Sequence, residues 1–122
     1  MKTLRAAART HALSYPEAWE DTPWGERVIK VRKKIFVFLG VDGGNEFTMG
    51  VKLPETQDLT LQLPFAEPAG YGLGKSGWVV LRFKSAAKTP LADIKAWIDE
   101  SYRAVAPKRL AKKLQAGTPS AR

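Results

Sequence analysis

Residues 27–52 read RVIKVRKKIFVFLGVDGGNEFTMGVK, and the apolar residues of this stretch indicate the fold. Residues 28–31 and 35–41 are runs of β-branched and aromatic residues separated by a short polar segment. This pattern predicts two strands joined by a hairpin. Two-residue hairpin turns favour Gly and Asn. The segment here contains Arg32 and Lys33 and neither of those residues. A turn of that kind would therefore strain both residues.

The sequence after the hairpin continues the same meander. Residues 42–45, DGGN, are typical of a turn, and the alternation of apolar with small or polar residues over 47–52 predicts a third strand. Residues 78–84, WVVLRFK, alternate in the same way and predict a fourth strand. The early connections are shorter than the roughly a dozen residues that a parallel crossover needs. We therefore expect one antiparallel sheet that contains the strands near Val28, Val37, Met49 and Val80.

Helices are predicted before, between and after these strands. The first covers residues 3–13, a second covers 54–62, and a short basic helix covers 108–114. The best-defined helix starts with the N-cap Thr89 and with Pro90. Its predicted buried stripe is Leu91, Ile94, Ile98 and Val105. This order of elements predicts an α/β chain of the α+β type, with a single antiparallel sheet and helices packed on one face.

Length and composition fit one domain without covalent or metal cross-links. The chain has 122 residues, and we assign 1–114 to the domain and 115–122 to a disordered tail. It contains no Cys and one His, so we expect no disulfide, no metal site and no cofactor. This composition favours a cytoplasmic location. No run is apolar enough to cross a bilayer, so no membrane partner is expected, and a monomer is favoured.

The charge of the chain predicts an anionic partner. The formal net charge is +8, and the positive residues gather in two clusters. The first has five Lys and Arg residues and no acid within residues 27–34. The second lies near the C-terminus and comprises Arg103, Lys108, Arg109, Lys112, Lys113 and Arg122. Because a hairpin carries the first cluster and a fraying chain end the second, only the first is expected to have a fixed geometry.

The sequence offers no set of catalytic residues. Residues 72–76, GLGKS, resemble the end of a phosphate-binding P-loop, but Ala69 stands where that loop needs a Gly. A strand is also predicted to follow, whereas a P-loop leads into a helix. His11 is the single imidazole, and nothing in the sequence pairs it with a Ser or Cys nucleophile. We therefore expect neither nucleotide hydrolysis nor another enzymatic activity.

Short motifs follow one another in a set order along the chain. They are residues 16–25 ending in Pro23-Trp24-Gly25, then Lys34-Ile35-Phe36, Lys52, Gly70-Tyr71, Lys75-x-x-Trp78 and Ser101-Tyr102. In this order and spacing they resemble the MmcQ/YjbR family over about residues 1–110. The resemblance implies a CyaY-like fold with a double-wing arrangement and a DNA-binding function. It implies no catalytic residue.

The sequence departs from that family's pattern at two places. Arg32 and Lys33 stand where the family often has glycines, which makes the hairpin tip more basic. Gly77 precedes Trp78, where a larger polar residue is common. CyaY-like folds also include the iron-binding frataxins, which use an acidic first helix. Here that helix carries Lys2, Arg5 and Arg9, so iron binding is disfavoured.

The leading hypothesis is a module that binds the phosphate backbone of DNA through the basic hairpin and the outer sheet face, without catalysis. On each strand the cations alternate with apolar residues that point inward, which predicts a basic outer face. The residues assigned to nucleic-acid binding are Lys30, Arg32, Lys33, Lys34, Lys52, Lys75, Trp78, Arg82 and Lys84. The alternative is a protein-interaction or small-ligand-binding module with an acidic partner, in which the Gly-rich loop and Trp78 line a pocket.

Overall fold

The structure, a computed structural model, describes residues 2–23, 25–40, 46–70, 72–84 and 91–114. Its helices and strands are, in chain order, α1 (Lys2–Leu13), β1 (Ala18–Asp21), β2 (Arg27–Val31), β3 (Lys34–Gly40), β4 (Phe47–Lys52), α2 (Gln57–Thr60), β5 (Ala66–Pro68), the 3-10 helix η1 (Leu73–Ser76), β6 (Trp78–Phe83), α3 (Leu91–Val105) and α4 (Lys108–Lys113).

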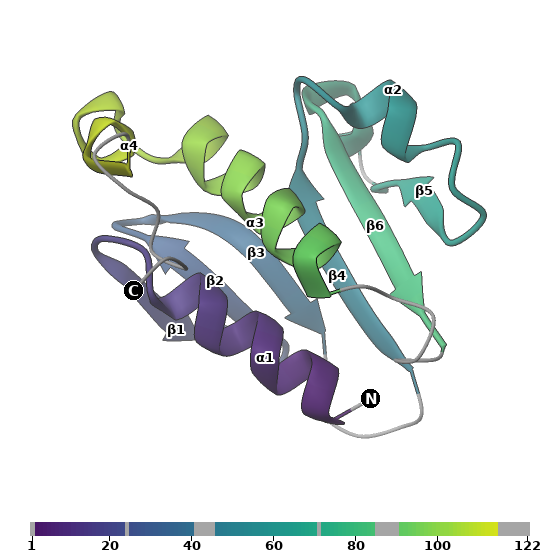
Figure 1. The fold of residues 1–122 in the computed structure, drawn as a ribbon, viewed down its shortest axis with the longest axis horizontal. Helices are drawn as coiled ribbons and strands as arrows, with labels where there is room; N and C mark the ends of the chain where they lie inside the picture. The colour runs from purple at the N-terminus through teal and green to yellow at the C-terminus, as the bar shows by residue number, and fades with distance from the viewer. Residues whose placement is uncertain (1, 24, 41–45, 71, 85–90, 115–122) are drawn as a thin grey trace.

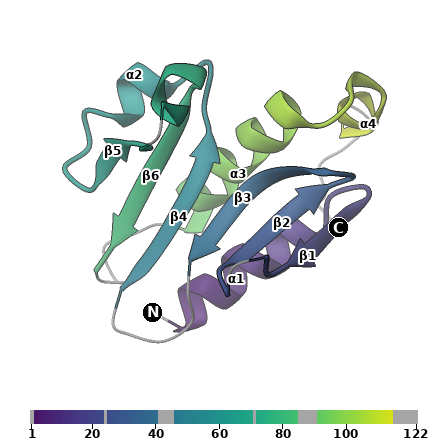
Figure 2. The same ribbon diagram turned by 180° about the vertical axis from the view of Figure 1, so that it is seen from behind.

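The described strands form one antiparallel sheet of six strands in the order β1-β2-β3-β4-β6-β5. Figures 1 and 2 show α1 and α3 side by side across one face of this sheet. The four predicted strands are therefore confirmed to share one antiparallel sheet. The predicted α+β class, with helices packed on one face, is also confirmed.

The sequence predicts neither of the two outer strands. The strand β1 has four residues, AWED, and β5 has three, AEP. Charged residues are typical of edge strands, where one side of the strand has no neighbouring strand. Pro is tolerated there because its missing backbone N–H would have no hydrogen-bond partner on that side. Segments this short carry no alternation from which a strand could be recognised.

The helix α3 covers the face that bears the apolar side chains of β6, as the sequence predicts, but its predicted stripe is wrong at Leu91 and only partly buried at Val105. Ile94 and Ile98 are fully buried, whereas Leu91 is 36% exposed and Val105 is half-buried. Fewer neighbours cover a side chain at a helix end. The remaining buried positions of α3 are Ser101 and Tyr102. The predicted cap at residues 89 and 90 lies outside the described residues.

Ser101 ties α3 to two central strands. Its hydroxyl oxygen Oγ accepts a hydrogen bond from the backbone N–H of Lys52 at 2.8 Å and donates one to the carbonyl oxygen of Phe36 at 2.5 Å. The side chain is fully buried, so these bonds satisfy polar groups that water does not reach.

A β-bulge buries two successive residues of β3. The register pairs Ile29 with Val37 and Lys30 with Ile35. Phe36 is thus an extra residue in β3, and both Phe36 and Val37 are fully buried. The Phe36 ring meets the Tyr102 ring edge-on at a centroid distance of 5.1 Å, and Tyr15 stacks on Tyr102 at 4.5 Å. The bulge therefore supplies one member of an aromatic cluster at the core.

The second predicted helix is shorter than the sequence indicates. Residues 54–62 were expected to be helical, whereas α2 covers Gln57–Thr60. The carboxylate of Glu100 in α3 accepts the backbone N–H groups of Glu55 at 2.8 Å and Thr56 at 3.1 Å. These bonds attach the segment before α2 to α3.

The helix α4 is anchored to the core by two leucines. Leu110 is fully buried and Leu114 is 4% exposed, and their spacing places them on the same side of the helix. The expectation that the C-terminal basic cluster lacks a fixed geometry is therefore wrong for the cations of α4. Arg122 and the predicted tail 115–122 lie outside the described residues.

His11 belongs to a hydrogen-bonded chain between α1 and α3. Its Nε2 lies 3.1 Å from the hydroxyl of Tyr15, and that hydroxyl donates to Oδ1 of Asp99 at 2.9 Å. Burial is the main reason that the pKa of His11 is lowered. The positive charge of Lys95 acts in the same direction, and the nearby Asp99 opposes both.

Stability should therefore decline as the pH falls below about 6.5, where an unfolded His begins to bind a proton that the folded His11 resists. The His11→Gln variant should lose most of the slope between about pH 7 and 5.5. The Glu17, Glu20 and Asp21 carboxylates, whose pKa values are lowered, contribute below this window. Urea unfolding at several pH values measures the slope. An equal slope in the variant would contradict the assignment to His11.

Candidate nucleic-acid interface

The turn between β2 and β3 is strained at Arg32. Val31 pairs with Lys34, so Arg32 and Lys33 are the two turn residues. Arg32 has a φ of +56°, a conformation in which a hairpin turn usually carries Gly. Two interactions hold it there. Arg32 Nε lies 3.0 Å from Oε1 of Glu17, and the indole N–H of Trp19 donates to the Arg32 carbonyl oxygen at 2.7 Å.

Glu17 links the hairpin tip to α4. The hydrogen bond from Arg32 is the largest cause that lowers the pKa of the Glu17 carboxyl, and the charges of Arg109 and Lys113 lower it further. Both α4 cations therefore act on the same carboxylate as Arg32. Figures 1 and 2 show the α1–β1 connection, the tip of the β2–β3 hairpin and α4 at the same end of the molecule.

Two basic segments that lie far apart in the sequence thus form one surface, which we call the basic corner. All its cationic side chains are exposed: Arg32, Lys33, Lys34, Lys108, Arg109, Lys112 and Lys113. The sequence alone predicts that the second segment frays, so it does not place the two segments on one surface. The leucine pair at positions 110 and 114 is the signal that could have predicted an anchored helix.

The sheet face opposite α1 and α3, the outer face, carries an apolar row between two acids. The cross-strand register runs Asp21, Val28, Phe38, Gly50, Val80 and Glu67. The Phe38 and Trp78 rings meet edge-on at a centroid distance of 5.4 Å, and both are half-buried. The centre of this face is therefore apolar and aromatic.

Two of the cations predicted for the outer face are held in ion pairs. Lys30 Nζ lies 2.8 Å from Oδ2 of Asp21, and Arg82 Nη2 lies 2.7 Å from Oε1 of Glu67. Each acid stands on an edge strand, next to the strand that carries the cation. These pairs offset positive charge that the sequence alone assigns to a phosphate surface.

The other predicted residues do not join the basic corner. Lys52 is half-buried opposite Trp78, whereas Lys84 is exposed just after β6, and Lys75 is exposed on η1. Three of the nine predicted site residues lie at the hairpin tip, where Arg32 is ion-paired with Glu17. Two more, Lys30 and Arg82, are in ion pairs on the sheet, and the other four lie elsewhere on the sheet and η1. The structure brings Arg32, Lys33 and Lys34 together with α4.

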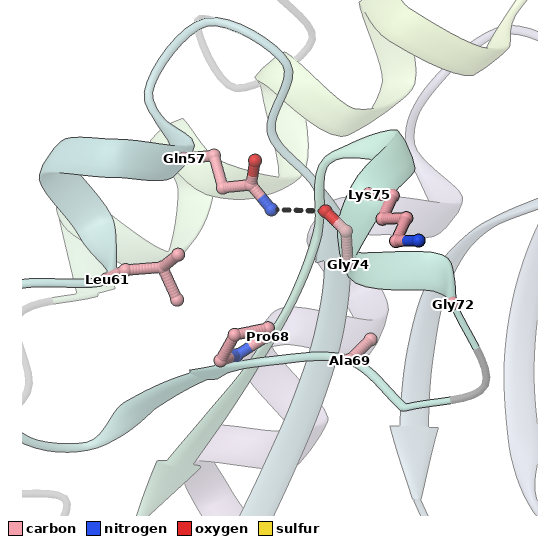
Figure 3. A pocket seen from close by; sticks show the side chains of 7 residues that line it. All are labelled: Gln57, Leu61, Pro68, Ala69, Gly72, Gly74 and Lys75. Atoms are coloured by element: carbon pink, nitrogen blue, oxygen red, sulfur yellow. Dashed lines mark hydrogen bonds between the residues drawn. The ribbon is translucent and has the colours of Figure 1, made fainter.

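A hollow of about 350 Å³ lies beside η1 (Figure 3). Its lining residues are Gln57, Leu61, Pro68, Ala69, Gly72, Gly74 and Lys75. Gln57 Nε2 donates to the Gly74 carbonyl oxygen at 2.7 Å, and the Lys75 ammonium points away from Leu61. The Gly-rich loop therefore lines a hollow, as the alternative hypothesis expects, but Trp78 is not among its lining residues.

Within the described part of the chain, no three His, Cys, Asp or Glu side chains lie close enough together to hold a metal ion. None of the helices in the same ranges combines the length and apolar character needed to span a membrane.

Comparison with known proteins identifies the family. A model of the YjbR family matches residues 13–104, three-quarters of the chain. The chain belongs to the YjbR family. The matched stretch contains the hairpin and ends before α4, so part of the basic corner of this YjbR protein lies beyond it. No curated protein matches the sequence.

A solved structure shows the same fold. The crystal structure of the Deinococcus radiodurans protein DR2400, described as a DUF419 domain, is similar to this YjbR protein with a TM-score of 0.68. The two chains are 22% identical, and the match covers 88% of this chain and 84% of the other. At this identity the likeness concerns the fold.

Proposed function

We propose that this YjbR protein binds nucleic acid, with DNA as the expected partner, by contacting backbone phosphates at the basic corner. The observation that carries the proposal is that the hairpin tip and α4 lie at the same end of the molecule with their cations exposed, and that Arg32, Arg109 and Lys113 all act on the Glu17 carboxylate. A cluster of positive charge on one surface is what attraction to a polyanion requires.

The geometry of α4 supports this proposal. Lys108 and Lys112 are one helical turn apart, as are Arg109 and Lys113, whereas Leu110 faces the core. The helix therefore turns a double row of cations to solvent. Because the buried leucines hold α4 in place, its cations need less ordering on binding than those of a flexible tail.

Contacts of this kind position a nucleic acid without reading its sequence. We therefore propose a binding function without catalysis and with little sequence preference. The family resemblance, which implies DNA binding, and the net charge of +8 support the same class of partner.

Affinity should fall steeply with salt, because each phosphate neutralised by a Lys or Arg releases condensed counterions. With four phosphate contacts, we expect a loss of about 100-fold between about 50 and 200 mM salt. Fluorescence anisotropy with labelled single-stranded and duplex DNA measures this loss. Polyglutamate of similar length is the control. Equal affinity for polyglutamate, or DNA binding that is insensitive to salt, would contradict the proposal.

The hollow beside η1 supports a second candidate function, the binding of a small acidic ligand. Its volume of about 350 Å³ falls within the usual range of small-molecule sites, and Lys75 supplies a positive charge at its rim. The basic corner remains the stronger candidate because it combines more exposed cations. A Lys75 variant, considered below, separates the two sites.

A further inference from the structure

Trp19 is an exposed tryptophan beside the basic corner. Its exposed fraction is 44%, the largest among the tryptophans that the structure describes. It lies on the edge strand β1, opposite Lys30 in the register. The next residue, Glu20, pairs with the core residue Ile29 and bonds Arg9 of α1, so Trp19 stands on the outer face.

The indole ring is held in one orientation. Its N–H donates to the Arg32 carbonyl oxygen at 2.7 Å, and Lys30 Nζ lies 5.1 Å from the ring centroid. Lys30 is itself fixed by its ion pair with Asp21. A hydrogen bond and a cation–ring contact, both from the β2–β3 hairpin, therefore orient a large ring that is still in contact with solvent.

Backbone strain is concentrated around this ring. Glu17 and Arg32 are the non-glycine residues with positive φ among the described residues, at +59° and +56°, and they form an ion pair with each other. Each such conformation costs free energy and persists only where the surroundings enforce it, which is common at binding sites. Here the strained pair brings the Arg32 carbonyl to Trp19.

We propose that Trp19 is a stacking platform for an unpaired base, and that the nucleic acid bound by this protein is single-stranded. This inference rests on the proposed function, because phosphates at Lys33 and Lys34 would hold the strand beside the ring. Binders of single strands combine a cationic track with aromatic rings on which bases stack. In a duplex the bases are stacked on one another, so the ring would add little.

Trp78 is a weaker candidate for this role. Its ring is half-buried and meets Phe38 edge-on, and it lies on β6, three strands away from β2. Trp19 is both more exposed and bonded directly to the hairpin tip.

The test compares three ligands of equal length: a single-stranded DNA, its abasic counterpart with the same phosphates, and a duplex. Trp19→Ala should weaken binding to the base-containing single strand by about 10- to 100-fold and leave binding to the abasic strand unchanged. Trp19→Phe lacks the indole N–H but keeps an aromatic face, so it should stay within a fewfold of the parent. Leu59→Ala, at a residue of α2 that is 69% exposed, is the control and should bind like the parent, whereas Trp78→Leu tests the competing platform on β6.

The outcomes separate the two proposals. If the parent binds none of the three ligands, the proposed function fails. If it binds the abasic strand as tightly as the base-containing one, nucleic-acid binding stands and the stacking role is wrong. Equal losses in Trp19→Phe and Trp19→Ala would show that the indole N–H holds the hairpin, which also overturns the inference. A loss confined to Trp78→Leu would move the platform to β6.

Discussion

Phe36→Ala should lower the free energy of unfolding by about 3–5 kcal/mol, the usual cost of removing a buried Phe ring. Phe36 is fully buried, and its ring contacts Tyr15 and Tyr102 edge-on at centroid distances of 6.0 and 5.1 Å. Because it is the extra residue of a bulge, the backbone holds its Cβ in place and the core cannot readily close around the cavity. Urea unfolding followed by circular dichroism measures the loss.

The matched control keeps all three rings. Tyr102→Phe removes only the hydroxyl that donates to the Pro16 carbonyl oxygen at 2.8 Å, so it should cost about 1 kcal/mol. Domains of this size have about 5–15 kcal/mol of stability in total, so Phe36→Ala should remove a substantial part of it. A loss below about 1.5 kcal/mol for Phe36→Ala would contradict the bulge geometry described above.

Reversing the charge of the basic corner should abolish nucleic-acid binding. Two pairs of substitutions divide the corner: Lys33→Glu with Lys34→Glu at the hairpin, and Lys112→Glu with Lys113→Glu on α4. Each pair lowers the formal net charge from +8 to +4. We expect each pair to weaken binding about 10-fold or more at about 100 mM salt, and the four substitutions together to weaken it about 1000-fold.

The informative comparison is between the two pairs. If α4 and the hairpin tip form one surface, the α4 pair should matter as much as the hairpin pair. The control pair, Lys75→Glu with Lys95→Glu, changes the net charge equally but lies on η1 and α3. At this salt concentration, a charge more than about 10 Å from a bound phosphate is largely screened from it. Because the control lysines lie outside the basic corner, the control should bind nearly like the parent.

Anisotropy measures these affinities, and circular dichroism checks folding, which should persist because the four corner lysines are exposed. An α4 pair that binds like the parent would confine the site to the hairpin. Equal losses in all pairs would mean that total charge rather than the corner governs binding. A loss confined to the control pair would point to the hollow at Lys75.

The sequence by itself determined the class of fold and the antiparallel pairing. Apolar residues alternate along the predicted strands, and the connections between the first three are too short for crossovers, so local patterns suffice to define which face is buried. The family resemblance, too, was readable from short motifs in order, and the match over residues 13–104 confirms it.

Only the tertiary structure decided which of the predicted cations are held in ion pairs. Asp21 and Glu67 stand on edge strands too short to predict, and there they pair with Lys30 and Arg82. The bulge at Phe36 was equally hidden, because two successive buried residues look like any apolar run.

The basic corner depends on contacts between segments that are distant in the sequence. Glu17 binds the hairpin at Arg32 and is acted on by Arg109 of α4, while Trp19 is oriented by the carbonyl of Arg32. Periodicity encodes which side of an element is buried, whereas the partner of a charge or of an indole N–H depends on which elements meet. That information exists only once the fold has placed α4 and the α1–β1 connection at the same end of the molecule as the hairpin tip.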